Sequence, residues 1–182
     1  TKTFTNIVSE EHGLPKWDEI NYEFDLMIAN PLEKVMEYVR VGASHLLVHA
    51  RSPGSVEAVQ KMLEMREDGG AFTVKVGVAL MPDAQPEDLL AFEAYDYVQV
   101  MGVMHIGKQG QPFDVHALHL VQRLRDRYPD LLLQIDGGVN KETIPALVKA
   151  GANILIAGSA VFGADVPSAA LSELTQLANG TI

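Results

Sequence analysis

Two glycine turns, each directly after an apolar run, constrain the fold of this chain most. Residues 131–162, LLLQIDGGVNKETIPALVKAGANILIAGSAVF, predict a buried strand ending at Asp136, a Gly137-Gly138 turn, a short amphipathic helix, a second buried strand and a Gly158-Ser159 turn. In a parallel sheet that is buried on both faces, strands are continuous apolar runs and functional residues lie at their carboxyl ends. Asp136 and both turns therefore mark the edge of the sheet where we expect a functional site.

The two turns suit the binding of a phosphate dianion. Glycine has no Cβ, so the backbone can approach a ligand closely and its N–H groups can converge on phosphate oxygens. The alternative is that these glycines only make tight turns between a strand and a helix. Because the loops after the last two strands of a (β/α)₈ barrel commonly hold phosphate, and because an aspartate ends the first strand, we favour a phosphosugar site.

Composition narrows the class of protein and of partner. The 182 residues, 47% hydrophobic and 21% charged, predict one globular domain over residues 1–182, with an irregular segment at 1–20. A formal charge of -10 argues against nucleic acid and anionic membranes as partners. With no cysteine, no secretion signal and no apolar run near 18 residues, we expect a cytoplasmic protein. Because the first residue is Thr1 rather than Met, we also expect the sequence to begin inside a longer protein.

From Tyr22 onward the pattern alternates strands and helices. The expected strands are 22–28, 45–50, 73–80, 97–103, 131–136 and the apolar run before Gly158. The expected helices are 31–42, 55–67, 85–95, 115–128, the short amphipathic helix after Gly138, and 166–178. These six strand-then-helix units predict an α/β fold of the TIM (β/α)₈ barrel type, incomplete at the N-terminus by about two units. The end of one helix and the start of the next strand are written twice, as Val39-x-x-Gly42-Ala43-x-x-Leu46 and Val148-x-x-Gly151-Ala152-x-x-Leu155, which favours a barrel of repeated units over an open sheet.

Several motifs together resemble the ribulose-phosphate 3-epimerase family. They are Asp25-Leu26-Met27-Ile28 with Asn30-Pro31, VGASHLLVH, VGVALMP, YVQVMGV, the loop GKQGQPF, and QIDGGVNKETIPALVKAGANILIAGSAVF. The resemblance covers about Tyr22 to Phe162 and is to a divergent branch with DLM in place of HLM. It implies a ribulose-phosphate-binding barrel that interconverts ribulose 5-phosphate and xylulose 5-phosphate by metal-assisted proton transfer at C3 through an enediolate.

The same resemblance implies a role for individual residues. Asp136 matches a proton-transfer group that is also a metal ligand, and Asp25 stands where the family has a metal-binding histidine. The implied contacts with the substrate and its phosphate are Gly107, Gly110, Gln111, Gly137, Gly138, Gly158 and Ser159, and Met27 and Met101 match methionines that cap the pocket. The implied cofactor is one divalent metal ion, Zn, Fe, Mn or Co, shifting toward Mn or Mg if Asp25 is a ligand. The implied partners are a small sugar phosphate and further copies of the same chain.

Departures from the family pattern leave alternatives open. Asp25 either ligates a metal or marks a site that has stopped binding one, and His49 either faces the mouth of the site or is a hydrogen-bonded structural histidine. Met104-His105 replaces an Asn-Pro, so His105 either reaches a substrate hydroxyl or is an exposed loop residue. The family strands that carry a second aspartate, another histidine and a serine are absent from the sequence, so we expect this segment alone to have weak activity or none. The alternative functions are epimerisation of a related ketohexose phosphate and phosphosugar binding by an inactive homologue.

Overall fold

Six strands and the helices between them make up the described part of the chain. The computed structural model describes residues 14–16, 18–67, 74–108 and 110–180. The strands are β1 (Glu23–Leu26), β2 (His45–His49), β3 (Lys75–Leu80), β4 (Tyr97–Met101), β5 (Leu132–Asp136) and β6 (Ile154–Ile156). The helices are η1 (Pro31–Glu33) and η2 (Pro86–Ala91), both of the 3₁₀ type, and α2 (Val35–Arg40), α3 (Ser55–Glu67), α4 (Val115–Arg127), α5 (Ile144–Ala150), α6 (Ser159–Phe162) and α7 (Pro167–Asn179). The strands follow chain order in the hydrogen-bonded sheet.

The chain divides into two compact units, which we describe separately. Unit 1 comprises residues 1–78 and 89–96, and unit 2 comprises residues 79–88 and 97–182. None of the helices in the described ranges combines the length and apolar character needed to cross a membrane.

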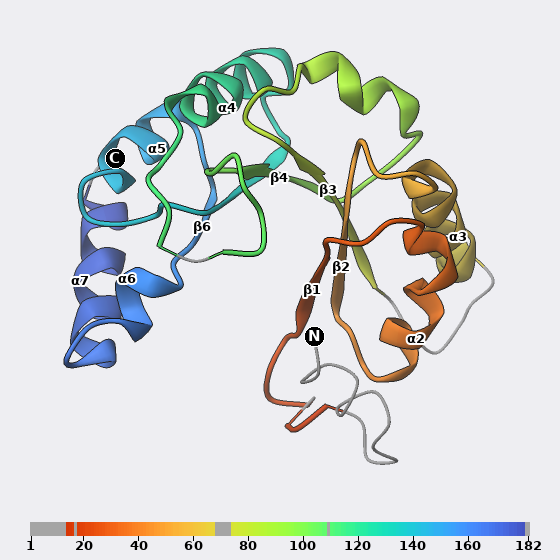
Figure 1. The fold of residues 1–182 in the computed structure, drawn as a ribbon, viewed down its shortest axis with the longest axis horizontal. Coiled ribbons are helices and arrows are strands. Elements are labelled where there is room, and N and C mark those ends of the chain that lie inside the picture. The colour runs from red at the N-terminus through yellow and green to blue at the C-terminus, as the bar shows by residue number, and fades with distance from the viewer. Residues whose placement is uncertain (1–13, 17, 68–73, 109, 181–182) are drawn as a thin grey trace. The chain divides into compact units, whose positions relative to one another are not determined.

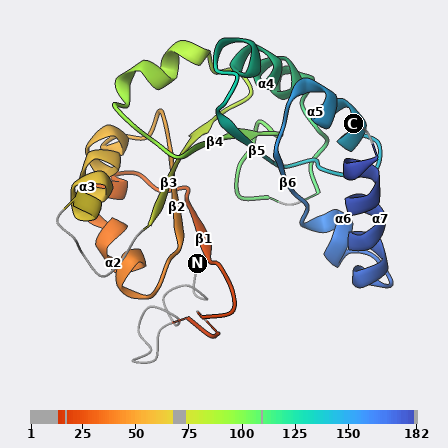
Figure 2. The same cartoon turned by 180° about the vertical axis from the view of Figure 1, so that it is seen from behind.

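Unit 1 pairs β1 and β2 in parallel and packs α3 against β2. Phe24 lies opposite Leu46 in the register, and three consecutive residues of β2, Leu46 to Val48, are buried. Helix α3 buries Ala58, Val59 and Met62, the spacing of one helical face. Both views place α2 and α3 on the same side of β1 and β2 (Figures 1 and 2). A strand buried on both faces is therefore what the apolar run HLLVH encodes.

Unit 2 holds the parallel strands β4, β5 and β6 with α4, α5 and α7. Ile135 of β5 lies opposite Val100 of β4 and Leu155 of β6. Helix α4 buries Ala117, Leu120, Val121 and Leu124, one residue or more in every turn of a single face. Its first turn is capped by Asp114, whose Oδ1 accepts a hydrogen bond from the His116 N–H at 2.9 Å. This capping lowers the pKa of the Asp114 carboxyl, because the backbone and side chain of His116 both donate to it.

The repeated glycine of the sequence has the same conformation in both places. Gly42 after α2 and Gly151 after α5 have φ of 99° and 104°, the left-handed conformation that ends a helix. A side chain at Gly151 would also meet Arg125, whose Cγ lies 2.7 Å from the position of a Cβ. The predicted echo between the two helix ends is therefore confirmed at the level of the backbone.

Two predicted helices are shorter than their patterns indicated. The helix expected over 31–42 is split into η1 and α2, because Asn30 enters with a left-handed φ of 54° and the first turn closes with the i to i+3 bond from Lys34 N–H to the Pro31 carbonyl. The helix expected over 85–95 is only η2, which closes with the bond from Phe92 N–H to the Leu89 carbonyl. Helix α3 has the bounds that the sequence predicted, 55–67. Most of the irregular segment expected at 1–20 and the first residue of the strand expected over 73–80 lie outside the described residues.

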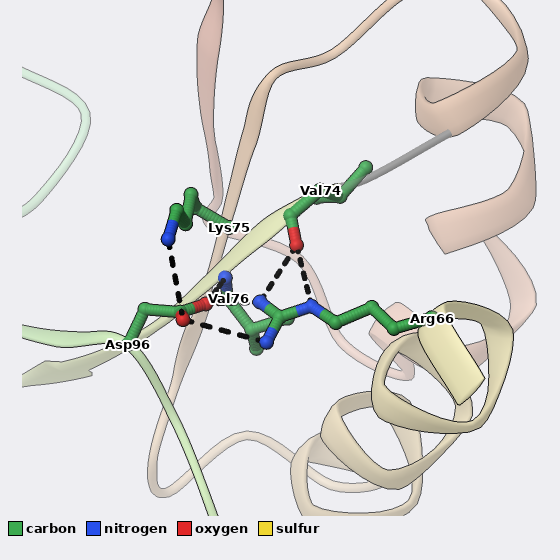
Figure 3. Close-up of polar contacts among 5 residues, drawn as sticks. All are labelled: Arg66, Val74, Lys75, Val76 and Asp96. Carbon is green, nitrogen blue, oxygen red and sulfur yellow. Dashed lines mark hydrogen bonds and ion pairs between the residues drawn. The ribbon is translucent and has the colours of Figure 1, made fainter. Parts of the chain in front are cut away.

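A charged cluster in unit 1 joins the end of α3 to the start of β3. Arg66 donates to the Val74 carbonyl from Nε at 2.9 Å and from Nη2 at 2.7 Å, and it also binds the Asp96 carboxylate (Figure 3). Asp96 accepts the Val76 N–H at 2.6 Å, and Lys75 Nζ lies 3.8 Å from its Oδ1. Burial alone would raise the pKa of the Asp96 carboxyl, but the hydrogen bonds from Arg66 and Val76 outweigh burial and lower it.

Candidate active site

Asp136 is the last residue of β5 and is half-buried. Its backbone carbonyl accepts a hydrogen bond from the Gly102 N–H at 2.6 Å, which ties the end of β5 to the end of β4. Gly137 and Gly138 follow with φ of 103° and 67°. The strand end that carries the carboxylate is therefore fixed by a neighbouring strand on one side and by a left-handed glycine turn on the other.

The ends of β4 and β5 approach each other so closely that side chains do not fit between them. A Cβ on Gly102 would lie 1.9 Å from the Gly137 carbonyl oxygen, and a Cβ on Gly138 would lie 2.8 Å from Phe113. Packing alone accounts for glycine at these positions. The tight-turn interpretation of Gly137-Gly138 is thus correct, and it is compatible with the phosphate interpretation because a turn without side chains also leaves its backbone accessible.

The segment after the glycine turn is braced by Asn140 and Thr143. Asn140 Oδ1 accepts the N–H groups of Glu142 and Thr143, both at 3.0 Å. Thr143 Oγ1 donates to the Gly138 carbonyl at 2.9 Å, and this bond connects the start of α5 to the glycine turn. These bonds hold the turn in one conformation, as an anion site built from backbone N–H groups requires.

The loop after β4 is ordered by a glutamine. Gln111 Nε2 donates to the carbonyl oxygens of Lys108, at 2.8 Å, and of His105. Gly107 and Gly110 have φ of 84° and 72°, and His105 is exposed. Beside the loop lies an open hollow of about 410 Å³, lined by Met104, His105, Gln111, Pro112, Phe113, Asp114, Val115 and His116. Gln111, predicted to contact substrate, therefore has a structural role in closing its own loop.

The turn after β6 leads directly into the short helix α6. Gly158 precedes this helix, and its carbonyl accepts the N–H groups of Val161 and Phe162 at 3.0 and 2.9 Å. Ser159 begins the helix and is exposed. Both predicted glycine turns of unit 2 thus follow the carboxyl ends of neighbouring parallel strands.

Asp25 and His49 form a pair at the carboxyl ends of β1 and β2 in unit 1. His49 Nε2 lies 2.9 Å from Asp25 Oδ1, and the side chains are only 8% and 19% exposed. The sequence indicated each residue separately, but not the pair, because the pair depends on the register of β1 with β2. His49 is therefore a hydrogen-bonded histidine whose partner is the predicted metal ligand. Met27, beside Asp25, is exposed.

The two predicted metal ligands belong to different units of the chain. Asp25 belongs to unit 1 and Asp136 to unit 2. Across the described ranges, no group of three or more His, Asp or Glu side chains is arranged to hold a metal ion. Divalent metals in proteins take several such ligands, so the described residues of neither unit hold a complete set by themselves.

Two buried glutamines, two residues before the ends of β4 and β5, were not among the predicted site residues. Gln99 on β4 and Gln134 on β5 lie opposite each other in the register, and Gln134 Nε2 donates to Gln99 Oε1 at 2.7 Å. Gln99 Nε2 in turn donates to the sulfur of Met101 at 3.2 Å. A signal was available, since each glutamine interrupts an otherwise apolar run, YVQVM and LLLQI.

The sequence is similar to a family of known proteins over most of its length. A model described as the ribulose-phosphate 3 epimerase family matches residues 3–162. The ribulose-phosphate 3-epimerase of Schizosaccharomyces pombe is 35% identical over 158 residues, which are 86% of this chain and 66% of that protein. That of Bacillus subtilis is 35% identical over 163 residues, 86% of this chain and 71% of that protein. The chain thus spans about two thirds of the length of these relatives.

Among solved structures, the fold is similar to that of 3-hexulose-6-phosphate synthase from Salmonella typhimurium. The TM-score is 0.67 at 16% identity, covering 92% of this chain and 77% of the other. At this identity the likeness concerns the fold alone. It confirms the predicted TIM barrel type, of which the described residues contain six strands.

Proposed function

Because this chain belongs to the ribulose-phosphate 3-epimerase family, we propose that the protein interconverts ribulose 5-phosphate and xylulose 5-phosphate by moving a proton at C3. The observation that carries the proposal is the position of Asp136, a half-buried carboxylate at the end of β5 and directly before a left-handed glycine turn. We also propose that the substrate is a small sugar phosphate, that the protein is cytoplasmic and that it forms a homo-oligomer.

Asp136 is the proposed proton-transfer group. Inversion at C3 requires that a proton leave one face of the carbon and that another be delivered to the opposite face, through an enediolate. A carboxylate can perform one of these transfers if its position relative to C3 is fixed. The bond from Gly102 N–H to the Asp136 carbonyl supports this role, because it fixes the backbone from which the carboxylate projects.

The backbone turns of unit 2 are the proposed phosphate site. N–H groups of Gly137, Gly138, Gly158 and Ser159 would surround the phosphate, with Gly107, Gly110 and Gln111 on the loop after β4. A chain with a formal charge of -10 offers little long-range attraction for an anion, so local N–H groups must supply it. The bracing of the turn by Asn140 and Thr143 supports this assignment, because a fixed turn loses little entropy when phosphate binds.

The divalent metal stays a prediction, with Asp136 and Asp25 as its predicted ligands. When bound, such an ion would polarise the C2 carbonyl and stabilise the enediolate. The residue roles proposed above do not depend on it. Met27, His49 and Met101 remain predicted pocket residues. His49 is hydrogen-bonded to Asp25, and the Met101 sulfur accepts a hydrogen bond from Gln99.

The test is substitution of Asp136 by asparagine in the full protein. We expect Asp136→Asn to lower the rate of C3 proton exchange by at least about 10³-fold, since an amide cannot accept the proton. Exchange is measured by NMR as incorporation of deuterium from D₂O into ribulose 5-phosphate. Binding of inorganic phosphate should change little, because the carboxylate is not a phosphate ligand in this proposal.

A matched control is Asp126→Asn, which makes the same chemical change on the exposed face of α4. It should leave exchange unchanged. If Asp136→Asn retains the exchange rate of the parent protein, Asp136 has no part in the reaction. Exchange with ketohexose phosphates but not with ribulose 5-phosphate would instead identify the related substrate class.

A further inference from the structure

The buried pair of glutamines has no explanation in packing. Gln99 is 1% exposed and Gln134 is 3% exposed, each inside an apolar strand. Burying a primary amide costs free energy unless it is hydrogen-bonded, whereas two aliphatic side chains would fill the same space without that cost. A functional role would explain why amides occupy these two positions, and their hydrogen bonds indicate what that role is.

Two hydrogen bonds of these amides connect Gln134 to Gln99 and Gln99 to a methionine. Gln134 donates to Gln99 at 2.7 Å, and Gln99 donates to the Met101 sulfur at 3.2 Å. Methionine has three rotatable side-chain bonds, so packing fixes it less firmly than it fixes leucine or isoleucine. A donor directed at the sulfur selects one of its rotamers. Met101 is 2% exposed, so water does not compete for this contact.

Met101 stands beside the proposed proton-transfer group. In the register of β4 with β5, Met101 lies opposite Asp136 just as Gln99 lies opposite Gln134. Residues two apart on a strand share a face, and neighbouring strands are about 4.8 Å apart. Gln99, Met101, Gln134 and Asp136 therefore share one face of this strand pair, with the two amides in the layer next to Met101 and Asp136.

We propose that Gln134 and Gln99 are positioning residues, which fix the Met101 side chain and through it restrict the conformations of the Asp136 carboxylate. This inference rests on the proposed function of Asp136. Proton transfer at carbon needs the carboxylate within a narrow range of positions, and a side chain fixed beside it excludes alternative rotamers. The amides themselves contact neither the substrate nor the phosphate turns in this proposal.

The decisive variant replaces both glutamines, Gln99→Leu with Gln134→Leu. Because both glutamines are replaced together, neither amide is left buried without the other, and denaturant unfolding of the variant checks that it folds. We expect kcat for C3 exchange to fall about 10- to 100-fold, with KM for ribulose 5-phosphate within about twofold of the parent value. Gln122→Leu, the same change on the exposed face of α4, should alter neither constant.

A double-mutant cycle separates positioning from packing. In a protein that carries Met101→Leu, removal of the two amides should cost much less activity than in the parent, because the sulfur on which they act is absent. Equal losses in both backgrounds would overturn the proposal. An unchanged kcat in the double glutamine variant would overturn it as well.

A readout without substrate distinguishes failure of this inference from failure of the proposed function. The NMR order parameter of the ¹³C-labelled Met101 methyl group should be high in the parent and clearly lower in the double glutamine variant. If the parent shows no C3 exchange, the epimerase proposal fails, and the methyl measurement still decides whether the amides fix Met101. An order parameter that does not change between parent and variant would overturn the positioning role.

Discussion

The residues directly before β4 and β6 form the same pair of backbone contacts with different side chains. Asp96 donates its N–H to the Val76 carbonyl at 2.8 Å, and its carboxylate accepts the Val76 N–H at 2.6 Å. Asn153 donates to the Leu133 carbonyl at 2.8 Å, and its Oδ1 accepts the Leu133 N–H at 2.9 Å. One side chain is charged and the other neutral, so the geometry requires an acceptor oxygen rather than a charge.

Each of these residues is also bound by an arginine from the last turn of a helix. Arg66 of α3 binds Asp96 and the Val74 carbonyl (Figure 3). Arg125 of α4 binds Asn153 Oδ1 at 2.6 Å and the Gly151 carbonyl at 2.8 Å. The Asp96 side chain is 22% exposed, whereas Asn153 is exposed. We call these two sets of contacts the Asp96 junction and the Asn153 junction. The charged Asp96 junction is the more buried one, so we expect it to contribute more to the free energy of unfolding and its contribution to depend on pH.

The largest effect should come from removing the charged acceptor. Asp96→Ala leaves the Val76 N–H without its side-chain acceptor and Arg66 without its counter-ion, which should lower the free energy of unfolding by about 2–3 kcal/mol. Asn153→Ala should cost about 1 kcal/mol, because its neutral side chain is more accessible to water. Denaturant unfolding measures both values. Equal costs would show that charge and burial add nothing to the shared geometry.

Replacing the charged side chain of Asp96 by a neutral amide should have a smaller effect on stability, and this effect should depend on pH. Asp96→Asn retains an acceptor for Val76 but loses the ion pair, which should cost about 1 kcal/mol at pH 7. The pKa of Asp96 is lowered in the folded protein, so the carboxylate contributes stability above its ordinary pKa of about 3.9. That contribution is lost as the pH falls from this value through the lowered pKa of the folded state.

Unfolding curves at pH 7 and at successively lower pH should therefore converge for Asp96→Asn and the parent protein below about pH 4. Amide exchange at Val76 gives a local measure of the same change, since its N–H is the one that Asp96 accepts. A constant difference at every pH would mean that folding does not lower the pKa of Asp96.

Sequence patterns predicted the fold where the determining interactions are local. The apolar run before Asp136 and the helical spacing in 55–67 each encode their element within a few residues, so β5 and α3 were found with nearly correct bounds. The helix expected over 85–95 was wrong in length, because the pattern does not reveal where a 3₁₀ turn ends and the chain must enter β4.

In the candidate site, too, the features with a local sequence signal were predicted and those that depend on strand pairing were not. Asp136 and its glycine turn were predictable, because a strand end followed by glycines is a local signal. The pairing of His49 with Asp25 and the pairing of Gln99 with Gln134 were not, because each depends on the register between two strands. Asp96 and Asn153 were missed for that reason too, although the repeated Gly-Ala before β2 and β6 indicated a recurring helix-to-strand junction.

The smallest effect is expected from the reverse conversion, Asn153→Asp, which places a carboxylate beside Arg125. The new ion pair lies at an exposed position, where such pairs contribute about 0–1 kcal/mol, and salt should weaken it. If the shared geometry alone defines the junction, this variant should acquire the acid sensitivity of the Asp96 junction without its larger stability. Amide exchange at Leu133 at pH 7 and at successively lower pH below about 4 would measure this, with Asn179→Asp at the exposed end of α7 as the matched control. A gain as large as the loss from Asp96→Asn would mean that burial does not separate the two junctions, and that the identity of the residue before the strand alone sets their stability.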